Sequence, residues 1–598
     1  MIATTLLLAS FGAAQMDTAR TPQGVGYTIE ARLNEETDIL EARAELRYTN
    51  NAAVALDTLW FHQHLNAFRP GSAWARRELR DGNRRFQDLG PEDHAFERIS
   101  LVEVDGRAAR TIYPGAPDST VVGIPLAAPL APGATAVVRF EWTARPSTLP
   151  RRQGRRDRRF DFAQWYPRIA PYDRGGWQTQ ALMPQGEFYG EFGSYEVTLD
   201  LASDQVIGAT GLVVEGDPGW RERARPGYDV IVDQSGFYPA AAPRNLGFLP
   251  GNAAAGRKRI RWRADDVHHF AWSVNPDYNF EGGTVRRLGV QGGDIAINVL
   301  FGSGDTDWAN GVALTRTQNA LTWLQEMFGP YPWPQLTNLR RIESGGTEFP
   351  MVLMDGSPSE GLILHEAAHQ YMHGILANNE FDEGWIDEGF ASFLTTWYFE
   401  DQGDMGLWEG TMAEIRDWER ARRTELIAKP GEEFRDPGVY STMTYTKTEL
   451  ILRMLRDLIG EEAMRAGMKL LYERRALSHV NEADLRTVFS EVAGEDLSWF
   501  FEQWFHTTDR LDYSITAATS TQQPNGSWTT RVDVQRDGDA FMPVTLQVGG
   551  QTRRLTARER RQSVEVNTPD RPTEVVLDPE NILIDIDISN NRRETRAP

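Results

Sequence analysis

The chain has 598 residues, of which 40% are hydrophobic and 25% charged, and its formal net charge is −22 at pH 7. This length implies several domains, and the composition is that of a globular protein. The negative charge argues against a basic nucleic-acid-binding surface. Because the sequence has no cysteine, disulfides, thiolate metal sites and cysteine nucleophiles are excluded.

The first residues, MIATTLLLASFGAAQ, contain a short apolar run followed by small residues, with Gly12-Ala13-Ala14 as a candidate cleavage site. This segment resembles the C-terminal part of a secretory signal peptide, although the positively charged residues that usually precede it are missing. We therefore expect a signal peptide over residues 1–15 and export to the periplasm or extracellular space; without it the chain is cytoplasmic. No later apolar run reaches the ~20 residues of a membrane span, so we expect none in the mature chain.

From Tyr27 to about residue 250 the sequence alternates between apolar and polar residues. In ILEARAELRY (39–48), every second residue is apolar and the residues between are charged, which is typical of a half-buried antiparallel strand. We expect a large N-terminal β domain over residues 16–280. The dense charge cluster RRQGRRDRRF (151–160) within it is interpreted as a solvated loop.

From about residue 280 the spacing becomes helical, as in residues 308–329, which end at a Gly-Pro pair. Alternating segments return after about residue 508. The sequence therefore predicts a multidomain α+β protein, with a mainly helical domain over 281–510 and a small β-sandwich over 511–598. No large helical domain is expected after it.

The segment GSPSEGLILHEAAHQYMHGILANN predicts a helix with Ser357 as its N-cap and Pro358 at its first position. His365 and His369 are four residues apart, so both project from one face and can bind a single metal ion. Glu366 can reach a water on that ion. The alternative is an exposed amphipathic helix whose histidines have no special role.

A catalytic zinc site needs a third protein ligand and an open position. Glu388 follows His369 after eighteen residues, at the start of a second apolar helix, and could complete the site if that helix returns antiparallel. His373 is the competing residue. On a straight helix, however, histidines at i, i+4 and i+8 spread around the cylinder. We therefore expect Glu388 to be the ligand and His373 to support the site or the fold.

The HEAAH sequence, the eighteen-residue gap and the block Trp385–Ala391 (WIDEGFA) resemble the gluzincin zinc aminopeptidases, the family of alanyl aminopeptidase and leukotriene hydrolase. In that family the block is usually Trp-Leu-Asn/Asp-Glu-Gly-Phe-Ala. The resemblance implies a thermolysin-like catalytic domain that binds one zinc ion through His365, His369 and Glu388, with Glu366 as the general base. It covers the middle of the chain, and the order of β domain and catalytic domain agrees with the family.

Upstream, the family carries a Gly-x-Met-Glu-Asn motif whose Glu binds the free amino group of the substrate. GGTEF matches it, with Gly345, Gly346 and Glu348 in register and with Thr347 and Phe349 in place of Met and Asn. The resemblance thus implies that Glu348 binds the substrate amine, while the two departures bear on specificity.

Downstream, the family has Tyr-x-Lys-Gly at the start of a helix and a second Tyr five residues earlier. Tyr440, Tyr445 and Lys447 match, with Thr448 in place of Gly, and Lys447 is one of only four lysines in the chain. The resemblance implies that Tyr445 stabilises the oxyanion. Gln164, in FAQWYPRIAPYD, loosely matches a family glutamine that lines the substrate site.

The expected function is therefore a zinc-dependent aminopeptidase acting on peptides with a free N-terminus. The alternatives are a zinc endopeptidase or epoxide hydrolase on the same scaffold, and a non-catalytic interaction scaffold. Asp387, next to Glu388, has two interpretations: a hydrogen-bond partner for a histidine ring, or a charge that stabilises a helix N-terminus.

Overall fold

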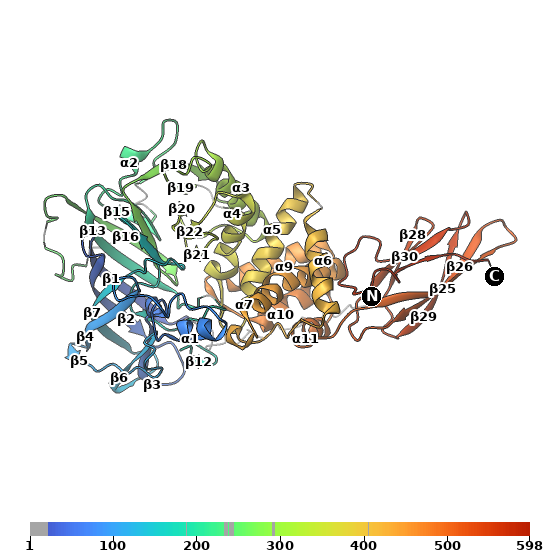
Figure 1. The fold of residues 1–598 in the computed structure, drawn as a ribbon, viewed down its shortest axis with the longest axis horizontal. Helices are drawn as coiled ribbons and strands as arrows, with labels where there is room; N and C mark the ends of the chain where they lie inside the picture. Colours follow the sequence, from blue (N-terminus) through green and yellow to red (C-terminus); the bar gives the residue numbers. More distant parts are fainter. Residues whose placement is uncertain are drawn as a thin grey trace, which may run out of the picture.

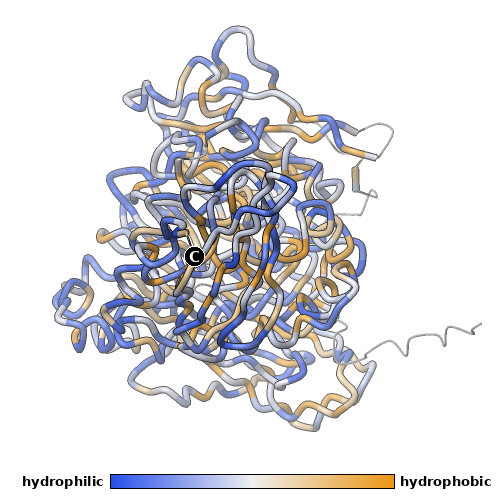
Figure 2. Tube along the Cα trace, turned by 90° about the vertical axis from the view of Figure 1, so that its right-hand side faces the viewer, coloured by the Kyte–Doolittle hydropathy of each residue, from blue (hydrophilic) through white to orange (hydrophobic). Residues whose placement is uncertain are grey.

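The computed structural model describes residues 22–186, 188–232, 237–238, 244–250, 252–289, 293–404 and 406–597. The predicted signal peptide lies outside the described residues. Strands come first along the chain, then helices, then a second group of strands, from left to right in Figure 1. Hydrophobic stretches run through the middle of the fold, with hydrophilic loops around them (Figure 2). This multidomain arrangement of sheets and helices is the predicted fold class in its coarse form.

The largest sheet of the N-terminal part has eight strands in the order β15-β16-β13-β1-β2-β7-β4-β5. Its neighbours are antiparallel except β1 and β13. The predicted alternation in β2 is confirmed, because its apolar residues are at most 1% exposed from Leu40 to Tyr48 while the charged residues between them face outward. The strands are β1 (Gly24–Asn34), β2 (Ile39–Thr49), β4 (Phe96–Val104), β5 (Arg107–Ala108), β7 (Thr135–Arg145), β13 (Gly193–Ala202), β15 (Leu212–Glu215) and β16 (Arg257–Val267).

Smaller sheets pack beside it, in the orders β10-β3-β6, β11-β12 and β14-β17-β9-β8. Their strands are β3 (Leu56–His62), β6 (Val121–Leu130), β8 (Gly154–Arg156), β9 (Arg159–Phe162), β10 (Arg168–Ile169), β11 (Tyr172–Asp173), β12 (Gly176–Trp177), β14 (Val206–Ala209) and β17 (Trp272–Asn275). Two short helices, α1 (Ala73–Arg80) and α2 (Trp220–Arg223), accompany them.

The arginine-rich segment 151–160 is not the solvated loop that its charge predicts. Half of it lies in β8 and β9, and β9 pairs with β17, which carries the segment into the fold. Arg152 is only 5% exposed, and its guanidinium carbon lies 4.8 Å from the centre of the Phe188 ring. The exposed Arg158 instead forms ion pairs with Glu35 and Asp204.

The sheet nearest the helices has the order β18-β19-β20-β22-β21, with three central parallel strands and antiparallel edges. Its strands are β18 (Tyr278–Val285), β19 (Ile295–Gly302), β20 (Gln335–Arg340), β21 (Glu348–Phe349) and β22 (Val352–Asp355). The predicted boundary at residue 280 falls within β18. The other predicted limits stay predictions.

The helices that follow form the middle of Figure 1. They are α3 (Val312–Met327), α4 (Glu360–Ala368), α5 (Phe390–Asp401), α6 (Leu407–Arg420), α7 (Pro437–Ser441), α8 (Thr448–Ile459), α9 (Glu461–Arg475), α10 (Glu482–Ala493) and α11 (Ser498–Phe505). Two π-helical segments, η4 (Trp385–Gly389) and η6 (Thr442–Lys447), interrupt them in the described residues, and η3 (Gln370–Ile375) is a kinked turn in which Met372 and His373 are not helical. Two short parallel strands, β23 (Leu376–Asn378) and β24 (Ser478–Val480), join distant parts of this region. Across the described residues, every helix is too short or too polar to cross a membrane.

The last strands form two sheets, β25-β26-β29 and β28-β27-β30-β31, at the right of Figure 1. They are β25 (Tyr513–Gln522), β26 (Trp528–Arg536), β27 (Val544–Val548), β28 (Gln551–Leu555), β29 (Arg561–Thr568), β30 (Glu574–Leu577) and β31 (Arg592–Glu594). Arg416 of α6 donates hydrogen bonds to the carbonyls of Leu583 (2.9 Å) and Asp585 (2.7 Å). The tail is thereby fixed to the helices.

Candidate metal centre and active site

Four segments bring the predicted site residues together. The helix α4 carries His365 and Glu366, and His369 caps its C-terminus. The other three are η4 with Glu388, η6 with Tyr445 and the edge strand β21 with Glu348. Residues far apart in sequence therefore meet at the end of one helix and the edge of one sheet.

The start of α4 differs by two residues from the prediction. Its N-cap is Ser359, whose side chain accepts a hydrogen bond from the Leu362 amide at 3.3 Å. Ser359 has the extended backbone of a cap (ψ 139°), and Pro358 lies before it, with its carbonyl bound by Arg316 at 2.6 Å. Ser357 is therefore not the N-cap.

Three side-chain atoms converge as metal ligands do. His365 Nε2 lies 3.2 Å from His369 Nε2 and 3.1 Å from Glu388 Oε2, and His369 Nε2 lies 3.3 Å from Glu388 Oε2. Two imidazole lone pairs cannot face each other at this distance without a proton or a cation between them. Two imidazoles and one carboxylate are a common donor set for zinc, and the three atoms fit it.

Asp387 accepts a hydrogen bond from His369 Nδ1, and both side chains are almost fully buried. This contact leaves Nε2 of His369 directed to the ligand cluster, the usual arrangement for a metal-binding histidine. Of the two interpretations of Asp387, the structure therefore shows the first, a hydrogen-bond partner for a histidine ring. Burial opposes a charge on His369, but Asp387 and Glu388 raise its pKa well above the ordinary value.

Neighbouring charged groups also shift the pKa of Glu388. Burial works against its ionisation, but His369 and His365 hold the pKa of this carboxyl well below its usual range. Glu388 is thus an anion at neutral pH and can serve as the charged ligand of a cation.

Glu366 and Glu348 lie beside this cluster and are each 4% exposed. One ligand atom of each lies within 4.8 Å of a nitrogen of His369. Burial raises the pKa of Glu366 well above its usual value, and the nearby Glu348 carboxylate adds to this effect. A buried carboxylate with a raised pKa is suited to accepting and returning a proton near neutral pH.

The two glycines before Glu348 have distinct roles. A Cβ on Gly346 would lie 2.0 Å from Glu366 Oε1, so only glycine leaves room for that carboxylate. Gly345 has a φ of +72°, which favours glycine. The structure thus explains both glycines by backbone geometry next to the site.

Thr347 and Phe349, the two residues that differ from the family motif, are buried and contact neighbouring residues. Thr347 Oγ1 is hydrogen-bonded by Arg341. Phe349 stacks on Phe188 with ring centres 5.3 Å apart, and its carbonyl accepts a hydrogen bond from Gln370 at 2.9 Å. Both residues therefore support the strand that presents Glu348.

Tyr445 donates a hydrogen bond to Glu388 Oε1, and its ring lies parallel to that of His365 at 6.1 Å. The hydroxyl is therefore next to the ligand cluster. Lys447 does not reach the site: it is 1% exposed and pairs with Glu419 at 2.8 Å. Its position in the motif reflects a buried ion pair between η6 and α6.

Two other predicted residues stand apart. Gln164 is buried with a left-handed φ of 56°, and among the described residues no hydrogen bond joins it to the cluster. His373 lies beyond the end of α4, where Met372 and His373 depart from helical geometry. A break in the helix, rather than drift along a straight one, therefore separates His373 from His365 and His369.

Sequence reasoning missed several buried polar residues behind the site. His268 and His269 approach His373, and Glu380 contacts it. Burial lowers the pKa of all three histidines. Arg152 was also missed; burial and Arg151 lower its pKa, whereas Glu348 and Tyr445 raise it, which places it near the site. The sequence holds no periodic signal for these residues, because they come from loops and helix ends.

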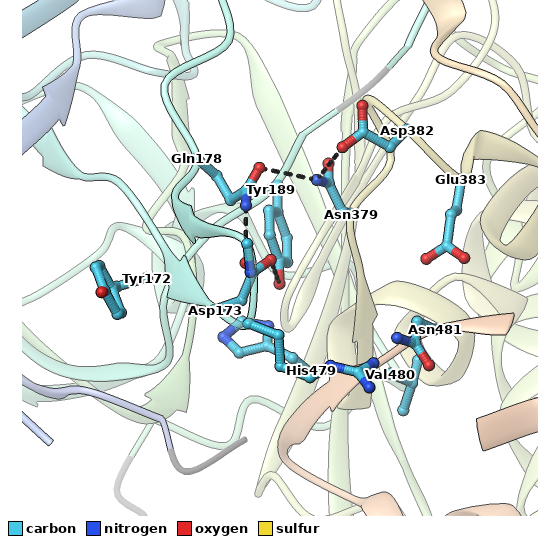
Figure 3. A pocket seen from close by; sticks show the side chains of 12 residues that line it. Tyr172, Asp173, Gln178, Tyr189, Asn379, Asp382, Glu383, His479, Val480 and Asn481 are labelled. Carbon is cyan, nitrogen blue, oxygen red and sulfur yellow. Dashed lines mark hydrogen bonds between the residues drawn. The ribbon is translucent and has the colours of Figure 1, made fainter. Parts of the chain in front are cut away.

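A hollow of about 290 Å³ lies between the β11–β12 hairpin, the loop that follows β23 and the strand β24 (Figure 3). Three of its side chains are hydrogen-bonded to one another: Gln178 Nε2 donates to Asp173 at 2.7 Å, and Asn379 donates to Gln178 at 3.2 Å. Burial raises the pKa of Glu383, on its rim, to about 7. The hollow contains no atom of the ligand cluster and belongs to the contact between the β-rich part and the helices.

With this geometry described, comparison with known proteins gives a consistent answer. Residues 354–504 match the peptidase family M1 domain. The match contains His365, Glu366, His369, Glu388 and Tyr445. Residues 354–504 are thus similar to the peptidase family M1 domain, in agreement with the resemblance seen in the sequence.

Among curated proteins, the chain is similar to probable aminopeptidase 1 of Sulfurisphaera tokodaii, with 26% identity over 34% of this chain and 27% of that protein. It is also similar to aminopeptidase N of Lactococcus lactis, with 24% identity over 24% of this chain and 18% of that protein. The matches thus span less than a third of either relative.

Among solved structures, the M1 zinc metallopeptidase from Deinococcus radiodurans has a TM-score of 0.54 and 17% identity, over 81% of this chain and 94% of that one. Legionella pneumophila aminopeptidase A, in complex with aspartic acid, has a TM-score of 0.62 and 12% identity, over 92% of this chain and 58% of that one. At these identities the likeness concerns the fold.

Proposed function

We propose that this chain is a zinc-dependent aminopeptidase that removes the N-terminal residue from peptides. The observation that carries the proposal is the convergence of His365, His369 and Glu388 within 3.1–3.3 Å of one another, beside two buried carboxylates and a tyrosine hydroxyl. The M1 domain match and the aminopeptidases among the similar proteins support the same activity.

His365, His369 and Glu388 would hold the zinc ion. When bound, zinc supplies Lewis-acid polarisation of the peptide carbonyl and a water acidified toward a pKa of ~7. Glu366 then accepts the proton of the attacking water and later delivers it to the leaving amine. Its burial beside Glu348 keeps its pKa high enough for both steps.

Tyr445 would donate its hydroxyl proton in a hydrogen bond to the carbonyl oxygen as negative charge develops there. Its hydroxyl already lies at Glu388 Oε1, within the ligand cluster. Glu348 would bind the N-terminal ammonium of the peptide, since it is a buried carboxylate whose Oε1 lacks a hydrogen-bond partner among the described residues. Fixing the ammonium there determines which peptide bond reaches the reacting groups. Export through residues 1–15 remains a proposal of the same kind.

A panel of aminoacyl-anilides tested with and without a chelator examines the proposal directly. We expect hydrolysis that the chelator abolishes and zinc restores. Peptides with a free and with an acetylated N-terminus separate an aminopeptidase from an endopeptidase. Equal cleavage of the two would remove the amine-binding role from Glu348, and no cleavage of any substrate by the zinc-loaded chain would overturn the activity.

A further inference from the structure

Behind the zinc-ligand cluster, three further histidines meet from two distant parts of the chain. His268 and His269 connect β16 to β17, and His373 lies in the helix break after α4. One ring nitrogen of each lies within 4.8 Å of those of the other two. The three side chains are 0%, 2% and 1% exposed. This is a closed, histidine-lined site, separate from His365 and Glu388.

The hydrogen bonds around His268 determine which of its nitrogens is available. Its Nε2 lies 3.1 Å from the carbonyl oxygen of His373, which can only accept, so Nε2 carries the proton. Its Nδ1 is therefore a lone pair, and it faces Nδ1 of His269 at 2.6 Å. At this distance a proton of His269 bridges the two nitrogens, and a metal ion bound here would displace that proton.

The other two rings leave nitrogens without partners. His373 Nδ1 contacts Glu380 Oε1, and Glu380 Oε2 accepts a hydrogen bond from the Phe188 amide. Within the described residues, His373 Nε2 and His269 Nε2 have no hydrogen-bond partner. Buried polar atoms without hydrogen-bond partners are rare, because the free-energy cost of removing them from water is not offset by a new hydrogen bond. These nitrogens therefore require an explanation.

We propose that His268, His269 and His373 bind a second divalent transition-metal ion, with zinc as the ion we would test first, and that Glu380 orients His373 for this role. Imidazole nitrogens suit zinc, copper, iron and nickel, whereas magnesium and calcium prefer oxygen. Glu380 Oε1 lies against Nδ1 of His373, where a carboxylate could orient the ring as Asp387 orients that of His369.

The three side chains are at most 2% exposed, so a substrate could not reach an ion held there, and the role of that ion would be structural. It would tie the β16–β17 connection to the catalytic helix at the residue where that helix breaks. The chain has no cysteine, so a metal cross-link between these two parts has to use histidine or carboxylate ligands. It would also hold the end of the segment that supplies His369.

The test counts metal in the full-length chain. A variant with His365→Gln and Glu388→Gln loses the first set of ligands and leaves the second intact. After loading with zinc and dialysis, mass spectrometry should find about two zinc ions per wild-type chain and about one in this variant. Cobalt loaded in place of zinc should give visible absorption bands in the variant. An absence of tightly bound metal in the variant, with its fold retained, would overturn the proposal.

His269→Gln provides the second measurement. It should lose about one zinc equivalent while His365, His369 and Glu388 keep theirs. His479→Gln is the matched control, because His479 is also buried but pairs with Glu191 at 3.0 Å and joins none of the possible ligand groups among the described residues. If His269→Gln does not fold, the zinc content of the His365→Gln, Glu388→Gln variant still tests the proposal.

Stability gives a readout independent of activity. In the His365→Gln, Glu388→Gln variant, a chelator should lower Tm by about 5 °C or more, since a metal bound only in the folded state stabilises it. An unchanged Tm together with no bound metal would mean that the histidines hold only protons, and the proposal would fall.

Discussion

Asp387 binds the Nδ1 of His369 and thereby turns its Nε2 to His365 and Glu388. Neither residue could do this alone, since an imidazole without a partner on Nδ1 is free to change its tautomer and its rotation. The acidic residue next to the third ligand is thus part of the metal centre.

Replacing Asp387 by Asn should weaken zinc binding by about 10–100-fold, because an amide orients the ring less firmly and does not balance its charge. Competition with a chromophoric chelator measures the zinc Kd. Glu383→Gln is a suitable control, since Glu383 lies on the rim of the neighbouring hollow. An unaltered Kd for Asp387→Asn would show that the ring is held by its packing.

Glu366→Gln should lower kcat by about 10²–10⁴ while the chain still binds zinc, because the amide cannot take the proton of the attacking water. Anilide hydrolysis and metal analysis on the same preparation test both parts. A fully active variant that holds zinc would exclude Glu366 as the general base.

Gly346→Ala should displace the carboxylate of Glu366 while leaving Glu366 itself unmutated. The new Cβ would lie 2.0 Å from Oε1 and 2.4 Å from Cγ of Glu366, so the carboxylate must move. We expect kcat to fall about 10-fold or more, since small displacements of a catalytic group are costly. Gly361→Ala is the control, because the nearest atom to its Cβ is 3.6 Å away. Wild-type kinetics in Gly346→Ala would show that Glu366 can act from another position.

Tyr445→Phe should lower kcat by about 10²–10³, the loss expected for one oxyanion donor. Tyr440→Phe is the matched control: the Tyr440 ring lies edge-on to Tyr445 at 6.4 Å, and its hydroxyl has no hydrogen-bond partner among the described residues. It should change kcat little. If the two variants lose activity equally, the effect comes from packing between α7 and η6.

Glu449 gives a pH dependence of stability. Burial raises its pKa to about 7, with a partly compensating hydrogen bond from Thr396 at 2.5 Å. Because its folded pKa lies above the unfolded value near 4.5, its contribution is fully present below pH 4.5 and is lost as the pH rises through 7. The loss is at most about 3 kcal/mol.

The Tm of Glu449→Gln should therefore be higher than that of wild type at pH 8 but not at pH 4.5. Differential scanning calorimetry measures both. The exposed Glu462→Gln is its control. If the Tm values of wild type and Glu449→Gln changed with pH in the same way, the raised pKa of Glu449 would be contradicted.

The sequence predicted the coarse fold and the ligand cluster because their signals are local and periodic. The alternation in β2 reports its buried face, and the spacing of His365 and His369 reports one helix face. It did not predict the burial of Arg152, because strand pairing between β9 and β17 is a long-range event. The same holds for the approach of His268 to His373, which requires two loops to be placed by the whole fold.

The π-helical segments η4 and η6 carry Glu388 and Tyr445. A π turn contains one residue more than an α turn, and one residue corresponds to about 100° of rotation. Shortening η4 or η6 by a single residue would thus point Glu388 or Tyr445 away from the centre while leaving the flanking helices intact. In these segments chain length itself is a functional property, so insertions and deletions that surface loops tolerate should here abolish activity without unfolding the protein.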